Sequence, residues 1–229
     1  MRSVNIIVGL ATLIIVAVVI WLLYKKRSTG DSSPFNCVYS TGERVQLDSN
    51  GKLHNLMLLT SGCSDAWGTA RGTDDASFVL TNSASPVEGY NSNATQVTTS
   101  VEPLVLEVED NKTARELQYG EHFKLYTQTE EYGKQRIMLT DEPPHQLVTD
   151  DWGGIFPIKS VTFKMTNQKT TGPTDHTVGW GDTFELEVKG FQTSKVKASS
   201  DCSDLLMIKG LTTDSCGDDV IWRIQKYQL

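Results

Sequence analysis

The sequence lacks the short motifs that mark common enzymes and nucleotide-binding proteins. It has no G-x-S-x-G nucleophile elbow, no H-E-x-x-H zinc motif, no Walker loop and no G-x-G-x-x-G phosphate cradle. Its four histidines, His54, His122, His145 and His176, include no pair at the i, i+4 spacing of a helical metal site. We expect His122 on the polar face of a strand, and His145 and His176 in turns. These absences predict a non-enzymatic protein with no metal site and no cofactor.

Cysteine is also scarce, with four residues and no C-x-x-C pair. A zinc site needs close ligand pairs, so this spacing disfavours one. An even number of cysteines bracketing a β domain predicts two disulfides instead, and disulfides normally form in an oxidising compartment. We expect two local pairs, Cys37 with Cys63 and Cys202 with Cys216. A disulfide that joins the two ends of the chain is the alternative.

Acidic residues are absent before Asp31, and a long apolar run lies in that region. Ile6 to Tyr24 contains no charged residue over 19 positions, and as a helix it would span roughly 28 Å, close to the hydrocarbon thickness of a bilayer. A cleaved signal peptide is disfavoured because the run exceeds the usual h-region and a basic cluster follows it. We therefore predict a transmembrane anchor over residues 1–27. The residues that define it are Ile6, Leu13, Ile20, Trp21, Tyr24, Lys25, Lys26 and Arg27.

Residues 28–34 are expected to form a short polar linker, and residues 35–229 a β domain. The chain beyond Arg27 has 17 basic and 28 acidic residues, which gives it a net charge of −11. Such a charge repels phosphate backbones and anionic lipid headgroups. The composition therefore argues against nucleic acid as a partner.

Two features of the sequence point to opposite sides of the membrane. The basic cluster at 25–27 places the domain on the cytoplasmic side by the positive-inside rule. The cysteines and the N-x-[ST] sequons at Asn93 and Asn111 would instead fit an extracellular domain, although sequons also arise by chance in a chain rich in serine and threonine. We predict the cytoplasmic orientation.

After Phe35, short alternating runs separated by turn residues dominate, which is typical of all-β domains. The pattern G-[DE]-x-[VF]-x-L occurs three times, at 42–47, 120–125 and 181–186. Period-two alternation puts the hydrophobic residues of each copy on one strand face. We expect six of them in the core: Val45, Leu47, Phe123, Leu125, Phe184 and Leu186. A second apolar run follows each copy (78–81, 137–140 and 206–209), and then a third (104–108, 161–165 and 220–224).

Three copies of a strand-rich unit resemble the β-trefoil, and the later copies and the closing Trp222–Gln225 look like strands of that fold. The resemblance covers about residues 35–229 and implies a short β-barrel capped by hairpins. Unit starts are 78 and 61 residues apart, so a trefoil would need long insertions. The turn-rich stretches 82–102, 143–157 and 167–179 are the candidates. Another β-barrel or a β-sandwich is the alternative.

Two polar loops have residues that could form a binding site. Asp48 to Gly51 begins like a calcium loop, but no bidentate glutamate follows at the later ligand positions, so a turn with Asn-Gly at its tip is expected. Asp150, Asp151 and Trp152 place an acidic pair beside an aromatic ring, an arrangement that can bind a sugar or a protein partner. The favoured interpretation is an ordinary turn with Trp152 packed under the domain.

A virus with an internal membrane would reconcile the two compartment signals. Large DNA viruses of this kind build a shell around a bilayer in the cytoplasm, and several encode their own thiol oxidases. In its organisation the chain resembles a membrane-anchored minor capsid protein of such a virus. The resemblance implies a single-pass protein of the virion's internal membrane, with its domain facing the capsid and with the bilayer and other structural proteins as partners. A membrane-anchored, lectin-like β-trefoil that binds carbohydrate or protein is the alternative.

Overall fold

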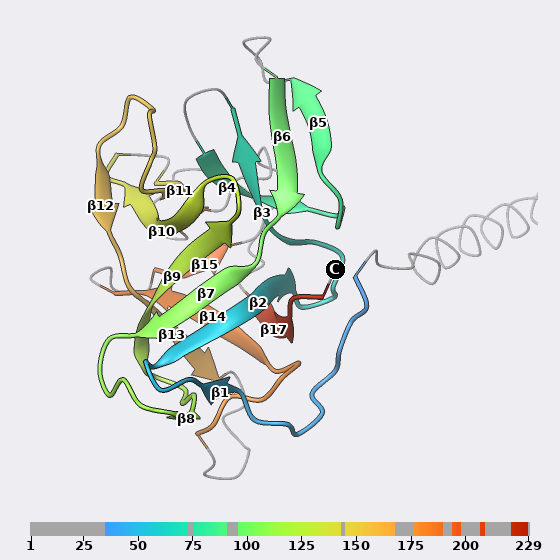
Figure 1. The fold of residues 1–229 in the computed structure, drawn as a ribbon, viewed down its shortest axis with the longest axis vertical. Coiled ribbons are helices and arrows are strands. Elements are labelled where there is room, and N and C mark those ends of the chain that lie inside the picture. The colour runs from blue at the N-terminus through green and yellow to red at the C-terminus, as the bar shows by residue number, and fades with distance from the viewer. Residues whose placement is uncertain are drawn as a thin grey trace, which may run out of the picture. The chain divides into compact units, whose positions relative to one another are not determined.

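The computed structural model describes residues 35–72, 76–90, 96–142, 145–167, 176–189, 194–197, 207–208 and 221–228, and this part is mainly β (Figure 1). The predicted anchor and linker lie outside these residues. Within them, no helix is long and apolar enough to cross a membrane. The strands are β1 (Gln46–Leu47), β2 (Lys52–Thr60), β3 (Ala66–Arg71), β4 (Ala76–Thr81), β5 (Val87–Tyr90), β6 (Gln96–Val101), β7 (Leu104–Val108), β8 (Arg115–Glu116), β9 (His122–Thr129), β10 (Gly133–Thr140), β11 (Leu147–Thr149), β12 (Ile158–Ser160), β13 (Phe163–Asn167), β14 (Thr183–Val188), β15 (Val196–Lys197), β16 (Met207–Ile208) and β17 (Ile221–Lys226).

Six antiparallel strands close a ring at the centre of the domain. Around it, β2 pairs with β7, β7 with β9, β9 with β13, β13 with β14, β14 with β17, and β17 returns to β2. Three sets of strands are inserted between successive ring strands: β3–β6 between β2 and β7, β10–β12 between β9 and β13, and β15–β16 between β14 and β17. The two other strands, β1 and β8, pair with each other. A closed ring leaves none of its strands with an unpaired edge. The barrel therefore consists of three successive parts with the same general plan.

The inward faces of the ring strands fill the barrel. Strands β9 and β14 alternate half-exposed and buried residues, as the sequence pattern predicts. Across the β9–β13 pair, Phe123 lies opposite Phe163, and their stacked rings have centroids 6.3 Å apart. All six residues of the predicted core set are buried, which confirms that prediction.

The first copy of the sequence repeat does not open a ring strand, so its predicted equivalence to the other two copies is wrong. The copies at 120–125 and 181–186 open β9 and β14, whereas the copy at 42–47 ends in β1, whose partner among the described strands is β8. An extra turn, Asp48–Gly51, lies between β1 and ring strand β2. This turn displaces the first copy from the barrel wall.

The apolar runs that follow the repeat copies are only partly equivalent. The third runs fall on β7, β13 and β17, which are the closing ring strands of the three parts. The second runs fall on β4 in the first part but on β10 in the second. β10 follows and pairs with ring strand β9, and its counterpart in the first part is β3, which follows and pairs with β2. The predicted order of strands therefore holds for the third run and is wrong for the second.

A cycle of three backbone hydrogen bonds joins the segments that precede β2, β9 and β14. The N–H of Val45 donates to the carbonyl of Val178, that of Val178 to Leu117, and that of Leu117 back to Val45, with N···O distances of 2.8–2.9 Å. All three residues are buried, so the cycle satisfies backbone groups that water does not reach. The first repeat copy thus supplies Val45 to this cycle rather than a residue to the barrel wall.

The Asp48–Gly51 segment is a turn, as predicted. The carboxylate of Asp48 accepts hydrogen bonds from the N–H groups of Lys52 and Asn50, at 2.9 and 2.8 Å, and the bond from Lys52 is the main cause that lowers the pKa of Asp48. Gly51 has φ +69°, and a Cβ there would lie 2.7 Å from Cγ2 of Val108. Glycine is therefore required for both its backbone conformation and its small size.

The segment that leads into the domain, residues 35–40, is fastened to the barrel by a disulfide. Cys37 is bonded to Cys63, in the turn after β2, which confirms the first predicted pair. Phe35 is buried in a small apolar cluster with Leu59 and Cys63, separate from the main core. The predicted Cys202–Cys216 pair lies outside the described residues.

Two side chains of β17 hold the same segment. Gln225 donates through Nε2 to the carbonyl of Asn36 and accepts through Oε1 from the N–H of Val38, each at 2.8 Å. Arg223 donates to the carbonyls of Gly181 and Val38, at 2.6 and 3.5 Å. Residues 35–40 are therefore attached to β17 and to the turn that follows β2. The pairing of β2 with β17 is the one that closes the ring.

Removing a core phenyl ring from a ring strand tests the inward face. Phe184→Ala should lower the free energy of unfolding by about 3–5 kcal/mol, because it leaves a cavity among buried neighbours. The control is Thr183→Ala, at the half-exposed neighbouring position, which should change it by less than about 1 kcal/mol. Urea unfolding of the full chain in neutral detergent, followed by tryptophan fluorescence, measures both. Equal effects of the two substitutions would contradict the assigned face of β14.

The Cys37–Cys63 disulfide should stabilise the domain by roughly 3 kcal/mol, because it closes a chain loop with a sequence separation of 26. The double variant Cys37→Ser/Cys63→Ser should therefore unfold at lower urea concentration than the oxidised wild type. Peptide mapping under non-reducing conditions should recover Cys37 linked to Cys63. Recovery of Cys37 linked to Cys202 or Cys216 would show that the pairing is wrong.

Candidate functional site

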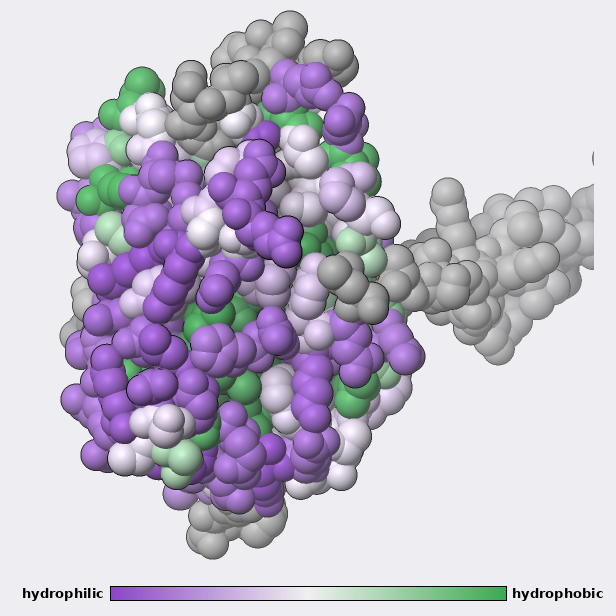
Figure 2. All heavy atoms as spheres, viewed as in Figure 1, coloured by the Kyte–Doolittle hydropathy of each residue, from purple (hydrophilic) through white to green (hydrophobic). Residues whose placement is uncertain are grey.

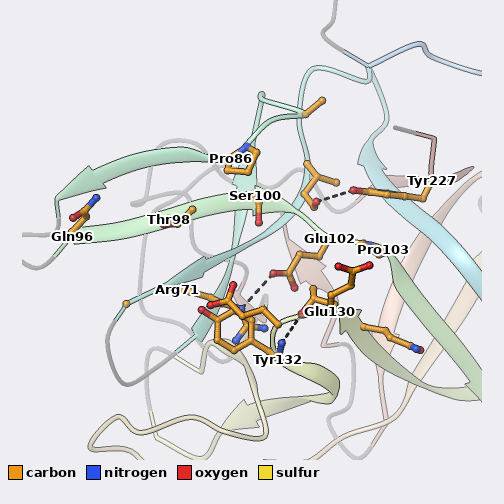
Figure 3. A pocket seen from close by; sticks show the side chains of 16 residues that line it. Arg71, Pro86, Gln96, Thr98, Ser100, Glu102, Pro103, Glu130, Tyr132 and Tyr227 are labelled. Carbon is orange, nitrogen blue, oxygen red and sulfur yellow. Dashed lines mark hydrogen bonds and ion pairs between the residues drawn. The ribbon is translucent and has the colours of Figure 1, made fainter.

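A hollow of about 820 Å³ lies between the inserted hairpin β5–β6 and the turn that joins β9 to β10 (Figure 3). The hairpin belongs to the predicted insertion at 82–102. Along β6, Gln96, Thr98 and Ser100 alternate onto the face that lines the hollow. The opposite wall is residues 128–132, which form the end of β9 and the turn to β10. Further lining residues are Pro86, Val101, Pro103 and Tyr227.

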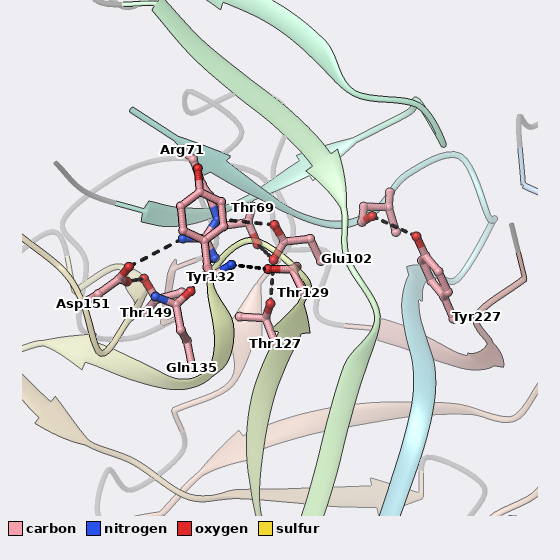
Figure 4. A network of polar contacts seen from close by, with 11 residues as sticks. Thr69, Arg71, Glu102, Thr127, Thr129, Tyr132, Gln135, Thr149, Asp151 and Tyr227 are labelled. Carbon is pink, nitrogen blue, oxygen red and sulfur yellow. Dashed lines mark hydrogen bonds and ion pairs between the residues drawn. The ribbon is translucent and has the colours of Figure 1, made fainter. Parts of the chain in front are cut away.

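A buried ion pair between Arg71 and Glu102 supports the hollow (Figure 4). Nε of Arg71 lies 3.4 Å from Oε1 of Glu102, and each side chain is only 8% exposed. The same guanidinium donates to Oε1 of Gln135 and has NH1 3.6 Å from Oδ2 of Asp151. It also lies over the ring of Tyr132, 3.8 Å from the centroid. Arg71 is therefore engaged by four partners from three separate segments of the chain.

The carboxylate of Glu102 is engaged through both of its oxygens. Oε2 accepts hydrogen bonds from the hydroxyls of Thr69 and Thr127, at 3.1 and 2.6 Å, while Oε1 faces Arg71. A buried charge is costly unless it is paired and hydrogen-bonded, and Glu102 meets both conditions. The network joins β3, β9 and β10 to the connection between β6 and β7. It therefore makes a stiff floor for the hollow.

Two tyrosines with raised pKa values line the hollow. A hydrogen bond to Glu131, followed by partial burial, raises the pKa of Tyr132 above its ordinary value. Burial, followed by the negative charge of Glu102, raises the pKa of Tyr227, whose hydroxyl donates to the carbonyl of Val101 at 3.3 Å. Both side chains therefore remain neutral phenols at physiological pH.

The buried charged and hydroxyl groups of the site are bonded to one another rather than presented to the hollow. Arg71 and Glu102 neutralise each other, and the threonine hydroxyls donate to Glu102. The described residues that line the hollow include no histidine or cysteine. No group of three or more His, Cys, Asp or Glu side chains among the described residues could hold a metal ion. The hollow offers hydrogen-bonding and apolar groups to a ligand.

The predicted binding loop contributes to this site through an aspartate rather than through its tryptophan. Asp150 is exposed, while Asp151 accepts from the hydroxyl of Thr149 and lies beside Arg71. Trp152 is half-buried, and its ring lies against Gly154, where a Cβ would come within 2.0 Å of it. Trp152 therefore packs within its own turn.

The four histidines are dispersed over the domain. His122 is half-exposed on the outer face of β9, as predicted. Nδ1 of His145 lies 3.2 Å from the carbonyl of Thr140, and its backbone has φ +54°. His54 pairs with a carboxylate of the neighbouring turn, and His176 is exposed. Their positions match structural or solvated roles.

The sequence analysis did not find the Arg71–Glu102 pair. A local signal for one member exists, since Arg71 follows Trp67 and Thr69 at period-two spacing and therefore shares their buried strand face. A charged residue on such a face requires a partner. That partner, Glu102, is 31 positions away, and only the fold of the intervening hairpins brings it near.

Breaking the buried pair should be far more costly than breaking a surface pair. Arg71→Met leaves Glu102 buried without its cation and should lower the free energy of unfolding by about 3–5 kcal/mol. Arg71→Met/Glu102→Leu should recover part of this loss. The matched control is Lys159→Met, which removes a partly exposed ion pair with Asp141 and should cost less than about 1 kcal/mol. Urea unfolding compares them, and equal losses in the two single variants would refute the structural role of Arg71.

Comparison with known proteins finds no matching family model and no matching curated protein. Among solved structures, the chain is similar in fold to winged bean albumin 1, with a TM-score of 0.48 and 14% sequence identity. The match covers 84% of this chain and 99% of that chain. Similarity at this level identifies no ligand and no function for the chain.

Proposed function

We propose first that the domain is a β-trefoil with long insertions. The support comes from the strand pairings: a closed ring of six antiparallel strands, an inserted set of strands in each of three parts, and the hydrogen-bond cycle of Val45, Leu117 and Val178. The hairpin β5–β6 in the first part is additional to this plan. It accounts for much of the long separation between the first two repeat copies.

We propose that the protein is a non-enzymatic structural protein that links a bilayer to a protein shell or scaffold, as a minor capsid protein does in a large DNA virus with an internal membrane. The observation that supports this best is the fastening of residues 35–40, immediately after the predicted anchor and linker. A disulfide and two side chains of β17 hold that segment within six residues of chain.

The fastening suits a protein that transmits a pulling force. The two attachment points, β17 and the turn after β2, belong to strands that pair with each other across five residue positions. A pull on residue 35 therefore acts on a disulfide and on the closing seam of a ring, rather than on one strand end. A loosely attached domain would not need such a connection.

The proposed orientation has the domain on the cytoplasmic side of the membrane, facing the capsid in the virion. The sequon residue Asn111 is exposed in the connection between β7 and β8, so an oligosaccharyltransferase would have access to it in the secretory lumen. Asn93 lies outside the described residues. Absence of glycan at Asn111 in cells would agree with the proposed side, and glycosylation would contradict it.

A lectin-like binding module is the second candidate. The hydroxyl and amide side chains of Thr98, Ser100 and Gln96 along one wall of the hollow favour it, because such groups hydrogen-bond to sugars. Binding of a neutral oligosaccharide to the full chain in neutral detergent would support this candidate over the structural one.

Deleting residues 1–27 tests the anchoring role. In a density gradient of cell lysate, the full chain should float with membranes, and the truncated chain should stay in the dense fractions, because a 19-residue apolar span is the proposed attachment. A matched control replaces residues 6–24 by a leucine-alanine span of the same length and should restore flotation. Where the shell assembles, the truncated chain should also fail to hold membrane against it. Normal flotation of the truncated chain would refute the proposal.

A further inference from the structure

We propose that the hollow beside Tyr132 receives a basic segment of a partner protein, with one lysine or arginine side chain entering the hollow. This proposal rests on the proposed docking function and names the chemistry of the partner. It concerns a site that the barrel alone would not form, because one of its walls is the inserted hairpin β5–β6.

The charges around the hollow exclude an anionic ligand. Its cation, Arg71, is committed to Glu102, Gln135 and Asp151. Glu130 and Glu131 line the exposed part of the hollow, and neither takes part in an ion pair within the described part of the chain. Incoming phosphate, sulfate or carboxylate would therefore meet two negative charges and no available cation. A lysine or arginine would meet two carboxylates.

The charge of the whole domain acts in the same direction. The chain beyond Arg27 carries −11, and the face in Figure 2 is mainly hydrophilic. A strongly acidic surface raises the association rate of basic partners and slows that of acidic ones. Long-range steering and the local charges of the hollow thus favour the same kind of partner.

The shape and lining of the hollow suit the aliphatic part of a long basic side chain. Pro86, Val101 and Pro103 offer apolar surface, and lysine and arginine bury their methylene stems on such surface while the charged head stays near polar groups. The ring of Tyr132 is 42% exposed and offers a further contact for a cation. A volume of about 820 Å³ also accommodates the backbone on either side of that side chain.

A sugar fits the same surface less well. One face of the Tyr132 ring is covered by the guanidinium of Arg71, at 3.8 Å from the centroid, so stacking of a sugar ring is restricted to the other face. Both carboxylate oxygens of Glu102 already accept hydrogen bonds or face a cation, so Glu102 is not available to bind sugar hydroxyls. The exposed carboxylates add affinity for a cation and little for a neutral ligand.

The test uses the full chain in neutral-detergent micelles and a fluorescently labelled octapeptide in which lysine alternates with alanine. Fluorescence anisotropy should show binding that weakens as salt rises, and no binding of the matched peptide with glutamate in place of lysine. Glu130→Gln/Glu131→Gln should weaken binding roughly tenfold. Thr98→Trp, which fills the hollow without changing charge, should abolish it.

The control variant is Asp110→Asn/Glu142→Gln, which removes the same charge at exposed positions outside the hollow and should change affinity less than about twofold. An equal loss in this control, or unchanged binding in Thr98→Trp, would show that the peptide binds only to the general acidic surface. Preferential binding of maltohexaose over the lysine peptide would overturn the proposal in favour of a sugar. Because the assay contains no bilayer, its failure is distinct from failure of the anchor, which flotation measures.

Discussion

The pairing of β17 with β2 is the contact on which the rest of the domain depends. It joins the last ring strand to the first and converts a row of antiparallel strands into a closed barrel. Closure satisfies the backbone groups that a sheet edge would expose, and it encloses one core that includes Phe123, Phe184 and Trp222. It also makes the structure non-local, because the seam brings together residues more than 150 positions apart. The Cys37–Cys63 disulfide and the hydrogen bonds of Arg223 and Gln225 lie beside this seam and fasten the incoming chain to it.

A closed barrel leaves the connections between its strands free to vary. The first part uses this freedom to add the hairpin β5–β6, whose strand β6 pairs with β3 rather than with any ring strand. The added hairpin must be held in position by contacts of its own. Arg71 and Glu102 provide it by tying β3 and the end of the insertion to β9 and β10. The directional bonds of this charged pair fix where the hairpin stands, a role distinct from its net contribution to stability.

The two proposals give two parts of the domain different roles. Residues 35–40 are held by covalent and hydrogen bonds suited to carrying load, whereas the hollow beside Tyr132 is exposed and lined by carboxylates suited to a transient basic partner. Single contacts of that kind are weak in water. Many copies fixed to one membrane would act together, since attachment of one copy raises the effective concentration of its neighbours at the same lattice. Weak contacts are therefore compatible with firm apposition of a membrane and a shell.

Local pattern in the sequence was enough for the features that depend on neighbouring residues. Alternation identified a mainly β domain and the buried faces of β9 and β14, the Asn-Gly signal identified the turn before β2, and proximity in sequence identified the Cys37–Cys63 pair. The apolar span before Lys25 likewise predicts an anchor from composition alone. Contacts between residues far apart in the sequence could not be predicted from such local patterns. The first repeat copy matches the other two in sequence, yet an inserted turn separates it from the ring strand β2. Arg71 contacts Glu102 because the fold of the intervening strands brings the two residues together. Side-chain alternation is a property of a few consecutive residues, whereas pairing across a closed barrel depends on which strands meet, and only the tertiary structure decides that.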